Sequence, residues 1–427
     1  MLTLCRANEI YLTCDLITDI MKTGNLLLFF LSISLSYSAF SQKIEEKNIK
    51  AHIKVLADDA MQGRLTGSAG EKMAMEYIEK QFKKLNLTPK GESSTFAQSF
   101  PFKGGMHGTG TEGIAHNVVA YIDNQATNTI IIGAHFDHLG LGENGSSLDA
   151  NPIGKIHNGA DDNASGVAGV LELARYFSTN KVKEKSNFLF ICFSGEELGL
   201  FGSKHFTEHP PLELSTVNYM INMDMIGRLN PTTKSVAVSG SGTSPVWEPL
   251  LKSIGSKLSI KTDSAGVGPS DHTSFYLKDI PVLHFFTGSH SDYHKPSDDW
   301  DKINYAGEKE VLELIIAVIE KLDSEPKLAF LTTKNKSMDS SRSFKVTLGI
   351  MPSYTSDAAG LLVDGVTEGR PAQRAGIETG DIIIEIGEYP IQDIQNYMDA
   401  LSKFEKGQTV PVKVKRKNEV ITVAVTF

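Results

Sequence analysis

The sequence predicts an α/β domain with a mainly parallel central sheet flanked by helices, followed by a small β-rich domain. Nearly continuous apolar runs of strand length alternate with amphipathic runs of helical length, which is typical of parallel sheets covered on both faces. The expected strands are 117–122, 129–134, 188–193, 217–223 and 281–286. The expected helices are 44–60, 71–85, 164–178, 199–208, 244–258 and 308–322. Beyond residue 348, apolar and polar residues alternate, which predicts the β-rich domain.

Length and charge limit the classes of protein to which this chain can belong. Its 427 residues are enough for two domains with a sizeable core. The formal net charge of -9 leaves no basic face for phosphates, so we expect no nucleic-acid partner. Of the three cysteines, only Cys192 lies outside the N-terminal segment, and it is expected as a buried apolar side chain.

The N-terminal segment has the pattern of an export signal. Lys22 precedes an apolar run from Leu26 to Leu35, and small residues follow up to Ser41. Because this run is too short to span a bilayer, we expect cleavage before Gln42 and no stable membrane insertion afterwards. The protein is then periplasmic or secreted. The alternative is an uncleaved anchor.

Composition divides the remaining chain into parts. Residues 1–41 are an upstream extension and signal peptide, and 42–323 form the α/β domain. Residues 324–342 are polar, rich in Lys and Ser and contain Pro326, so we expect a linker. Residues 343–427 form the small domain.

Acidic and histidine residues follow the ends of several expected strands. They are His135, Asp137 and His138, then Glu196 and Glu197, then Asp224, then His290, Asp292 and His294. In parallel sheets these ends meet at one edge, where ligand groups collect. The turn from His157 to Gly166 adds Asp161 and Asp162, which repel each other unless a cation or hydrogen-bond donors compensate. The pattern predicts a metal site.

These motifs resemble the zinc aminopeptidases of the aminopeptidase Y and bacterial leucyl aminopeptidase type. The resemblance covers roughly residues 50 to 320 and rests on five motifs in order. They are His135-Phe136-Asp137, Gly159 to Gly166, Gly195 to Gly199, Asn222 to Met225, and Tyr293-His294.

The resemblance implies two zinc ions per chain and a role for each motif residue. Asp161 would bridge both ions, with Asp162 following through a cis peptide. One zinc would also bind His135 and Asp224, and the other Glu197 and His294. Glu196 would be the general base, and Asp137 would orient His135. Oxygen and imidazole ligands suit a catalytic zinc that keeps a position open for water.

One part of the family pattern is missing. Some members place an oxyanion-binding tyrosine three residues before a Ser-Asp-His run, whereas Val267 precedes Ser270 here. Ser270 and His272 are only candidates for the pocket wall. The histidines expected to be structural or at the surface are His138, His157, His284 and His290.

The C-terminal segment resembles a PDZ domain of the HtrA type. Its marks are the run from Gly369 to Ile383, a helix after Asp393 and the alternating Val410, Val412 and Val414. By this resemblance Gly349 and Ile350 line a loop that binds the C-terminal carboxylate of a peptide or partner protein. The alternative is a purely structural appendage.

The sequence therefore predicts an exported dizinc aminopeptidase with a peptide-binding PDZ domain. Glutaminyl cyclases and carboxypeptidases of the same fold are alternatives within the enzymes. A non-catalytic peptide-binding scaffold is the alternative outside them, and it would require loss of a ligand or of the base.

Overall fold

The computed structural model describes residues 43–103, 112–143, 145–333, 346–353, 358–366, 369–392, 394–417 and 419–427. The predicted signal segment lies outside these residues, as does the second part of the predicted linker, 334–342. The described part contains no helix long and apolar enough to cross a membrane.

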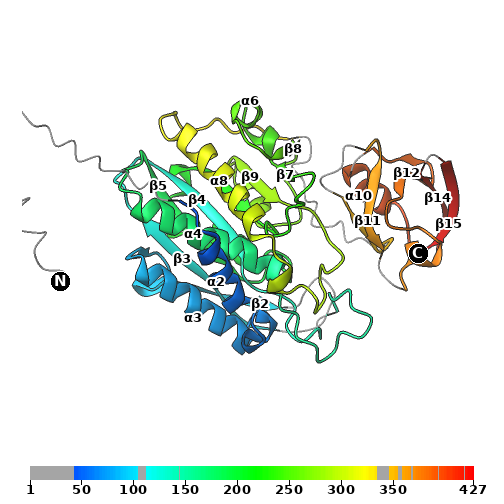
Figure 1. The fold of residues 1–427 in the computed structure, drawn as a ribbon, viewed down its shortest axis with the longest axis horizontal. Coiled ribbons are helices and arrows are strands. Elements are labelled where there is room, and N and C mark those ends of the chain that lie inside the picture. Colours follow the sequence, from blue (N-terminus) through cyan, green and yellow to red (C-terminus); the bar gives the residue numbers. More distant parts are fainter. Residues whose placement is uncertain are drawn as a thin grey trace, which may run out of the picture. The chain divides into compact units, whose positions relative to one another are not determined.

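Within the described residues, the first sheet has nine strands in the order β1-β3-β5-β4-β6-β9-β7-β8, with β2 paired to β3 (Figure 1). The strands are β1 (Thr88–Pro89), β2 (Ala97–Lys103), β3 (Glu112–Ile122), β4 (Asn128–His135), β5 (Ser186–Phe193), β6 (Val217–Met223), β7 (Ser235–Ser239), β8 (Ser259–Asp263) and β9 (Val282–Phe286).

The centre of this sheet is parallel, as predicted. Strands β5, β4, β6 and β9 are paired in parallel, and so are β7 and β8. Strands β1, β2 and β3 join through antiparallel pairs, as does β7 to β9, so the complete sheet is mixed. The parallel centre brings the carboxyl ends of four strands to one edge.

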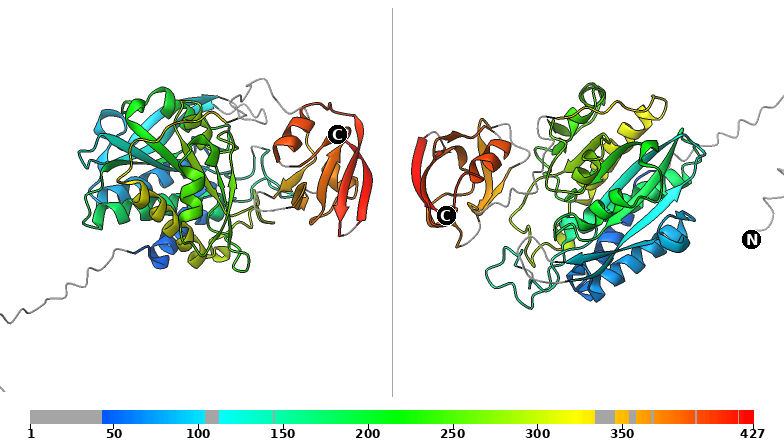
Figure 2. Two further views of the ribbon diagram at one scale, coloured as in Figure 1. Left: turned by 90° about the horizontal axis from the view of Figure 1, so that it is seen from above. Right: turned by 180° about the vertical axis from the view of Figure 1, so that it is seen from behind.

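Helices cover both faces of the sheet (Figures 1 and 2). They are α2 (Glu46–Leu56), α3 (Ala69–Lys84), α4 (Gly166–Thr179), α5 (Phe201–Glu208), α6 (Trp247–Ser253), α7 (His272–Tyr276) and α8 (Tyr305–Leu322). Alternate residues of β4 face opposite cores: Ile130 and Ile132 pack with α2, α3, α4 and α8, whereas Ile131 packs with α5 and α7. This two-sided burial explains the continuous apolar runs of the central strands.

The C-terminal domain has its own sheet and its own apolar core. The strands are β10 (Ile350–Pro352), β11 (Leu361–Val366), β12 (Ile382–Ile386), β13 (Tyr389–Pro390), β14 (Thr409–Arg416) and β15 (Glu419–Thr426); the helices are α9 (Pro371–Arg374) and α10 (Ile394–Leu401). Strand β10 ends the main strand order, beside β11. Gly349, just before β10, has φ +72°, and a Cβ there would lie 2.2 Å from Cβ of Arg370. This turn therefore requires glycine.

The first part of the predicted linker packs against the α/β domain. The amide of Leu328 donates to Asn218 Oδ1 at 2.8 Å, and the ring of Phe330 lies 5.4 Å from that of Tyr276. Residues 334–342 lie outside the described part of the chain.

Candidate metal centre

The predicted site residues come from segments that follow the parallel strands. His135 ends β4, Glu196 and Glu197 follow β5, Asp224 follows β6, and His294 lies in the segment after β9. Because these strands are parallel, the five side chains reach the same edge of the sheet.

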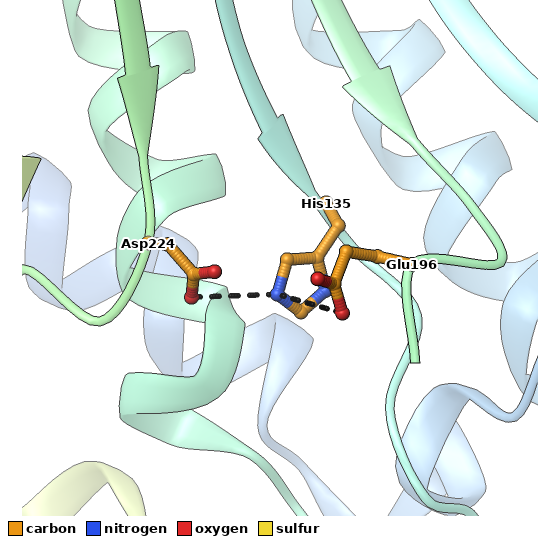
Figure 3. Close-up of side chains that lie close together, drawn as sticks. All are labelled: His135, Glu196 and Asp224. Atoms are coloured by element: carbon orange, nitrogen blue, oxygen red, sulfur yellow. Dashed lines mark ion pairs between the residues drawn. The ribbon is translucent and has the colours of Figure 1, made fainter. Parts of the chain in front are cut away.

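His135, Glu196 and Asp224 form a first group, shown in Figure 3. His135 Nε2 lies 3.4 Å from Asp224 Oδ1 and 4.0 Å from Glu196 Oε2. All three side chains are buried or nearly so, with exposed fractions of 1%, 11% and 14% for His135, Glu196 and Asp224.

A second group contains His294, Glu197 and His138. His294 Nε2 lies 3.3 Å from Glu197 Oε2, and His138 Nδ1 lies 2.8 Å from Glu197 Oε1. The two imidazole rings meet edge to face, with centroids 5.8 Å apart. His138 was expected to be structural, but the structure places it beside a predicted ligand. Its position three residues after His135, at the end of the same strand, was the available signal.

Asp162 joins the two groups. Its Oδ1 lies 3.3 Å from Nε2 of His135, and its Oδ2 lies 3.1 Å from Nε2 of His294. The carboxylate therefore points one oxygen at each group. This is the position that sequence analysis gave to Asp161.

The structure corrects that prediction, because Asp161 points elsewhere. Its Oδ1 accepts a hydrogen bond from the Gly227 amide at 2.7 Å, and its Oδ2 lies 3.1 Å from Nε2 of His290. The cis peptide likewise joins Asp162 to Asn163, not Asp161 to Asp162. The physical reason is local: Asp298 accepts from the amides of both aspartates, and the turn then directs only Asp162 toward His135.

Neighbouring groups hold several of these side chains. His135 Nδ1 lies 3.2 Å from the main-chain carbonyl of Asp137 and 3.6 Å from its carboxylate. Asp137 Oδ1 also accepts from the amide of Glu196 at 3.2 Å. Ser270 Oγ donates to Asp224 Oδ2 at 2.8 Å, so it supports a predicted ligand and does not simply line a pocket wall.

Electrostatics in the metal-free site favour positive charge. Burial disfavours protonation of His135, yet the carboxylates of Asp224 and Glu196 outweigh it and raise its pKa well above the ordinary histidine value. Burial is likewise outweighed at His294, where Glu197 and Asp162 raise the pKa well above that value. Buried histidines with raised pKa values mark a site that attracts cations.

The adjacent Glu196 and Glu197 have opposite pKa shifts. Burial, opposed by the charge of His135 and reinforced by that of Asp224, raises the pKa of Glu196 well above the ordinary value. At Glu197, burial is outweighed by the charge of His294, and the pKa falls to about 2. Opposite shifts in neighbouring carboxyl groups separate a proton carrier from a permanently ionised ligand.

The donor set fits divalent metal ions. Within the described residues, each of the clustered carboxylates forms ion pairs with histidines and none forms one with a lysine or an arginine. These pairs join Asp162, Glu196, Glu197 and Asp224 to His135, His138 and His294. Four buried carboxylates without such compensation are costly unless cations bind. Imidazole and carboxylate donors without thiolates match a catalytic zinc site.

Two other histidines named in the sequence analysis contact other side chains. His157 contacts Ser147 Oγ at 2.7 Å, and the ring of His284 stacks on that of His272 with centroids 4.4 Å apart. In the C-terminal domain, Gly349 directly precedes β10 and Ile350 is its first residue.

Known proteins are similar in sequence to part of this chain. The chain is 29% identical over 255 residues to leupeptin-inactivating enzyme 1 of Streptomyces exfoliatus, covering 58% of this chain and 50% of that protein. It is 30% identical over 196 residues to aminopeptidase YwaD of Bacillus subtilis, covering 42% of each. The chain thus spans half or less of the length of these two relatives.

Solved structures share the fold. The LapA structure of Legionella pneumophila has a TM-score of 0.51 and 25% identity, covering 66% of this chain and 74% of LapA. Glutaminyl cyclase of Porphyromonas gingivalis also has a TM-score of 0.51, with 17% identity over 66% of this chain and 99% of its own. Residues 346–427 match the profile of the PDZ domain, and residues 117–319 match that of peptidase family M28. These matches assign residues 117–319 to peptidase family M28 and residues 346–427 to the PDZ domain.

Proposed function

We propose that this protein is a dizinc metallo-aminopeptidase that hydrolyses the N-terminal peptide bond of peptides. The observation that carries the proposal is Asp162, whose two oxygens face two separate groups of histidine and carboxylate ligands.

Each ligand has a place in this proposal. His135 and Asp224 would bind one zinc, Glu197 and His294 the other, and Asp162 both. When bound, such a pair of ions supplies an activated water and polarises the substrate carbonyl.

Glu196 is the proposed general base. Its raised pKa makes it a better proton acceptor, which suits a group that takes a proton from water and returns it to the leaving amine. The hydrogen bond from the Glu196 amide to Asp137 fixes the backbone that carries this side chain. Asp137 thereby connects the base with His135.

The charge and apolar surroundings of the centre fit an N-terminal residue. A negative site attracts the substrate α-ammonium, which favours cleavage at the N-terminus over internal cleavage. An apolar cluster of Met225, Ala237, Phe286 and Tyr293 adjoins the ligands Asp224 and His294. This cluster favours an apolar side chain on the N-terminal residue.

The remaining parts of the proposal concern location and the PDZ domain. We propose export to the periplasm or the medium, on the basis of the N-terminal sequence pattern. Strand β10 lies at the end of its sheet, which suits a peptide added as a further strand with its carboxylate near Gly349 and Ile350.

One assay tests the catalytic proposal. The purified protein is given aminoacyl substrates with a free or an acetylated amino group, with and without chelator, and bound zinc is counted per chain. We expect cleavage of the free form alone, loss of activity with chelator, and two zinc ions. A single zinc with cyclisation of N-terminal glutamine would favour the cyclase alternative, and cleavage from the carboxyl end would favour a carboxypeptidase.

A further inference from the structure

The segment from Gly63 to Thr66 lies beside the end of β4, although nothing in its composition resembles a ligand motif. Gly63 O accepts from the amide of Gly140 at 2.9 Å, and Arg64 O accepts from that of His138 at 3.1 Å. Leu65 and His138 form a parallel bridge. The segment therefore pairs with the residues just after β4, next to those of the metal centre.

Arg64 connects this segment to the two turns that carry ligands. Its side chain is fully buried, and Nε donates to the Phe136 carbonyl at 2.7 Å, between His135 and Asp137. The same guanidinium donates to the carbonyls of Asn158 and Gly159 at 2.7 and 2.9 Å, just before Asp161. A fourth bond goes to the Leu56 carbonyl at the end of α2.

These contacts fix two ligand-bearing turns relative to each other. Arg64 presents several donors in a rigid plane, so one side chain binds carbonyls from three segments at once. A lysine has no such planar fork. The guanidinium also places a positive charge near Asp162, Asp137 and Glu197.

Thr66 makes a single, well-defined contact with the centre. Its hydroxyl donates to Asp137 Oδ2 at 2.8 Å, and the residue is 5% exposed. The other oxygen of Asp137 accepts from the Glu196 amide, and its carbonyl faces His135 Nδ1. Thr66 thus holds Asp137, which contacts both a proposed ligand and the proposed base.

We propose that Gly63–Thr66 is a positioning segment for the metal centre, acting through Arg64 on the ligand turns and through Thr66 on Asp137. Neither residue touches the reacting atoms. The inference rests on the proposed function, since it assumes that His135 and Asp162 bind metal.

The test is the substitution Thr66→Val, which keeps the shape of the side chain and removes one donor. Zinc affinity is measured by competition with a chelator, and the melting temperature of the zinc-free protein is measured alongside. We expect a 10- to 100-fold loss of zinc affinity, the usual effect of removing a group that supports a metal ligand. Thr66→Ser, which keeps the hydroxyl, should restore wild-type affinity.

Thr207→Val is the matched control. Thr207 is also buried, at 4% exposure, and donates to a main-chain carbonyl on α5, away from the ligands. It should lower the melting temperature as much as Thr66→Val does and leave zinc affinity unchanged. Arg64→Lys, which retains the charge, should weaken zinc binding as well.

Three results would overturn the inference. Zinc affinity of Thr66→Val within twofold of wild type would show that Thr66 has no positioning role. Equal loss of affinity in Thr207→Val would show that general destabilisation is the cause. A wild-type chain that binds no zinc would overturn the proposed function itself, and with it this inference.

Discussion

Two pairs of identical neighbours, Asp161–Asp162 and Glu196–Glu197, show how surroundings assign different roles to the same side chain. Asp162 faces two histidines, whereas Asp161 accepts from a main-chain amide and contacts His290. The structure therefore makes a separate prediction for each member of each pair.

The first prediction concerns the bridging position. Asp162→Asn keeps the size of the side chain and removes its charge, so we expect fewer than two zinc ions after dialysis and activity reduced by about 10²-fold or more. Asp161→Asn is the control and should retain both ions, because an amide oxygen still accepts from Gly227. Metal analysis of the two variants checks this, and the opposite outcome would restore Asp161 as the bridge.

The second prediction concerns the proton carrier. Glu196→Gln should reduce turnover by about 10²-fold or more while the zinc content stays at the wild-type level, because a carboxamide cannot accept the proton. Glu197→Gln should instead lose zinc, because Glu197, whose pKa is lowered to about 2, is the proposed ionised ligand. Turnover and metal content are measured on the same preparations. An active Glu196→Gln enzyme would disprove the role of Glu196 as base.

The sequence predicted that most residues of this centre lie close together, but it could not predict which side chain of an adjacent pair points into the centre. His135, Glu196, Glu197, Asp224 and His294 were found because each follows a strand or lies beyond one, and parallel strands share an edge. Which of two adjacent aspartates faces the edge depends on the local path of the turn. Composition contains no information about that path.

At the scale of elements, the start of α4 links the Asp162 turn to β6. Asn163 Oδ1 accepts from the amides of Gly166 and Met225, at 2.8 and 3.2 Å, and its Nδ2 donates to the Met223 carbonyl at 3.0 Å. Asn163, three residues before the helix begins, therefore bonds to the residues on both sides of Asp224. Little room remains there for a side chain.

This packing gives the third prediction, at two glycines of α4. A Cβ on Gly166 would lie 2.3 Å from Asn163 Oδ1 and 2.6 Å from the Met223 carbonyl, so Gly166→Ala should cost about 1–3 kcal/mol and weaken zinc binding. A Cβ on Gly169 would meet only flexible side-chain ends, at 2.9 Å from Met223 Sδ and 3.0 Å from Leu312 Cδ2.

Gly169→Ala is therefore the control for Gly166→Ala. Alanine favours the helix by about 1 kcal/mol over glycine, which offsets the small rearrangement of Met223 and Leu312. Melting temperature and zinc affinity of both variants check the contrast. Equal effects would mean that the contact with Asn163 and Met223 has no special importance.

Most elements could be predicted because their burial is two-sided or strictly amphipathic. Strand β6 has the predicted bounds, and every residue in it is buried. Strand β8 was not predicted, since its residues Ser259 to Asp263 are half-buried or exposed and show no apolar run. Such a strand is defined by its pairing with β7, which lies about 20 residues earlier in the chain.

At the scale of the whole molecule, the charged groups of the metal centre make the stability of the fold depend on pH and on bound metal. In the zinc-free protein the raised pKa values of His135 and His294 mean that the folded state binds protons more tightly than the unfolded chain. Their stabilising contribution is complete below the ordinary histidine pKa of about 6.5 and is lost as pH rises through the folded values. Asp162 and Glu197 have lowered pKa values, so their contribution is lost only in acid.

The fourth prediction follows from the direction of the pKa shifts at His135 and His294. Zinc replaces the protons on His135 and His294, so the increase in melting temperature caused by zinc should grow as pH rises from about 6 to 8. The zinc-free protein should lose stability over the same range. Thermal unfolding at several pH values, with saturating zinc or with chelator, measures both. Calorimetry in two buffers of different ionisation enthalpy should also detect proton release on binding.

A comparison of the zinc-bound and zinc-free forms separates this mechanism from a general effect of net charge. With a formal charge of -9, a pH-dependent repulsion spread over the surface would act on the zinc-bound and zinc-free forms alike. The difference in melting temperature between the two forms therefore reports on the metal centre alone. A zinc-induced rise in melting temperature that stays constant over this range would mean that zinc displaces no protons from His135 and His294, and so does not bind between the carboxylates that raise their pKa values.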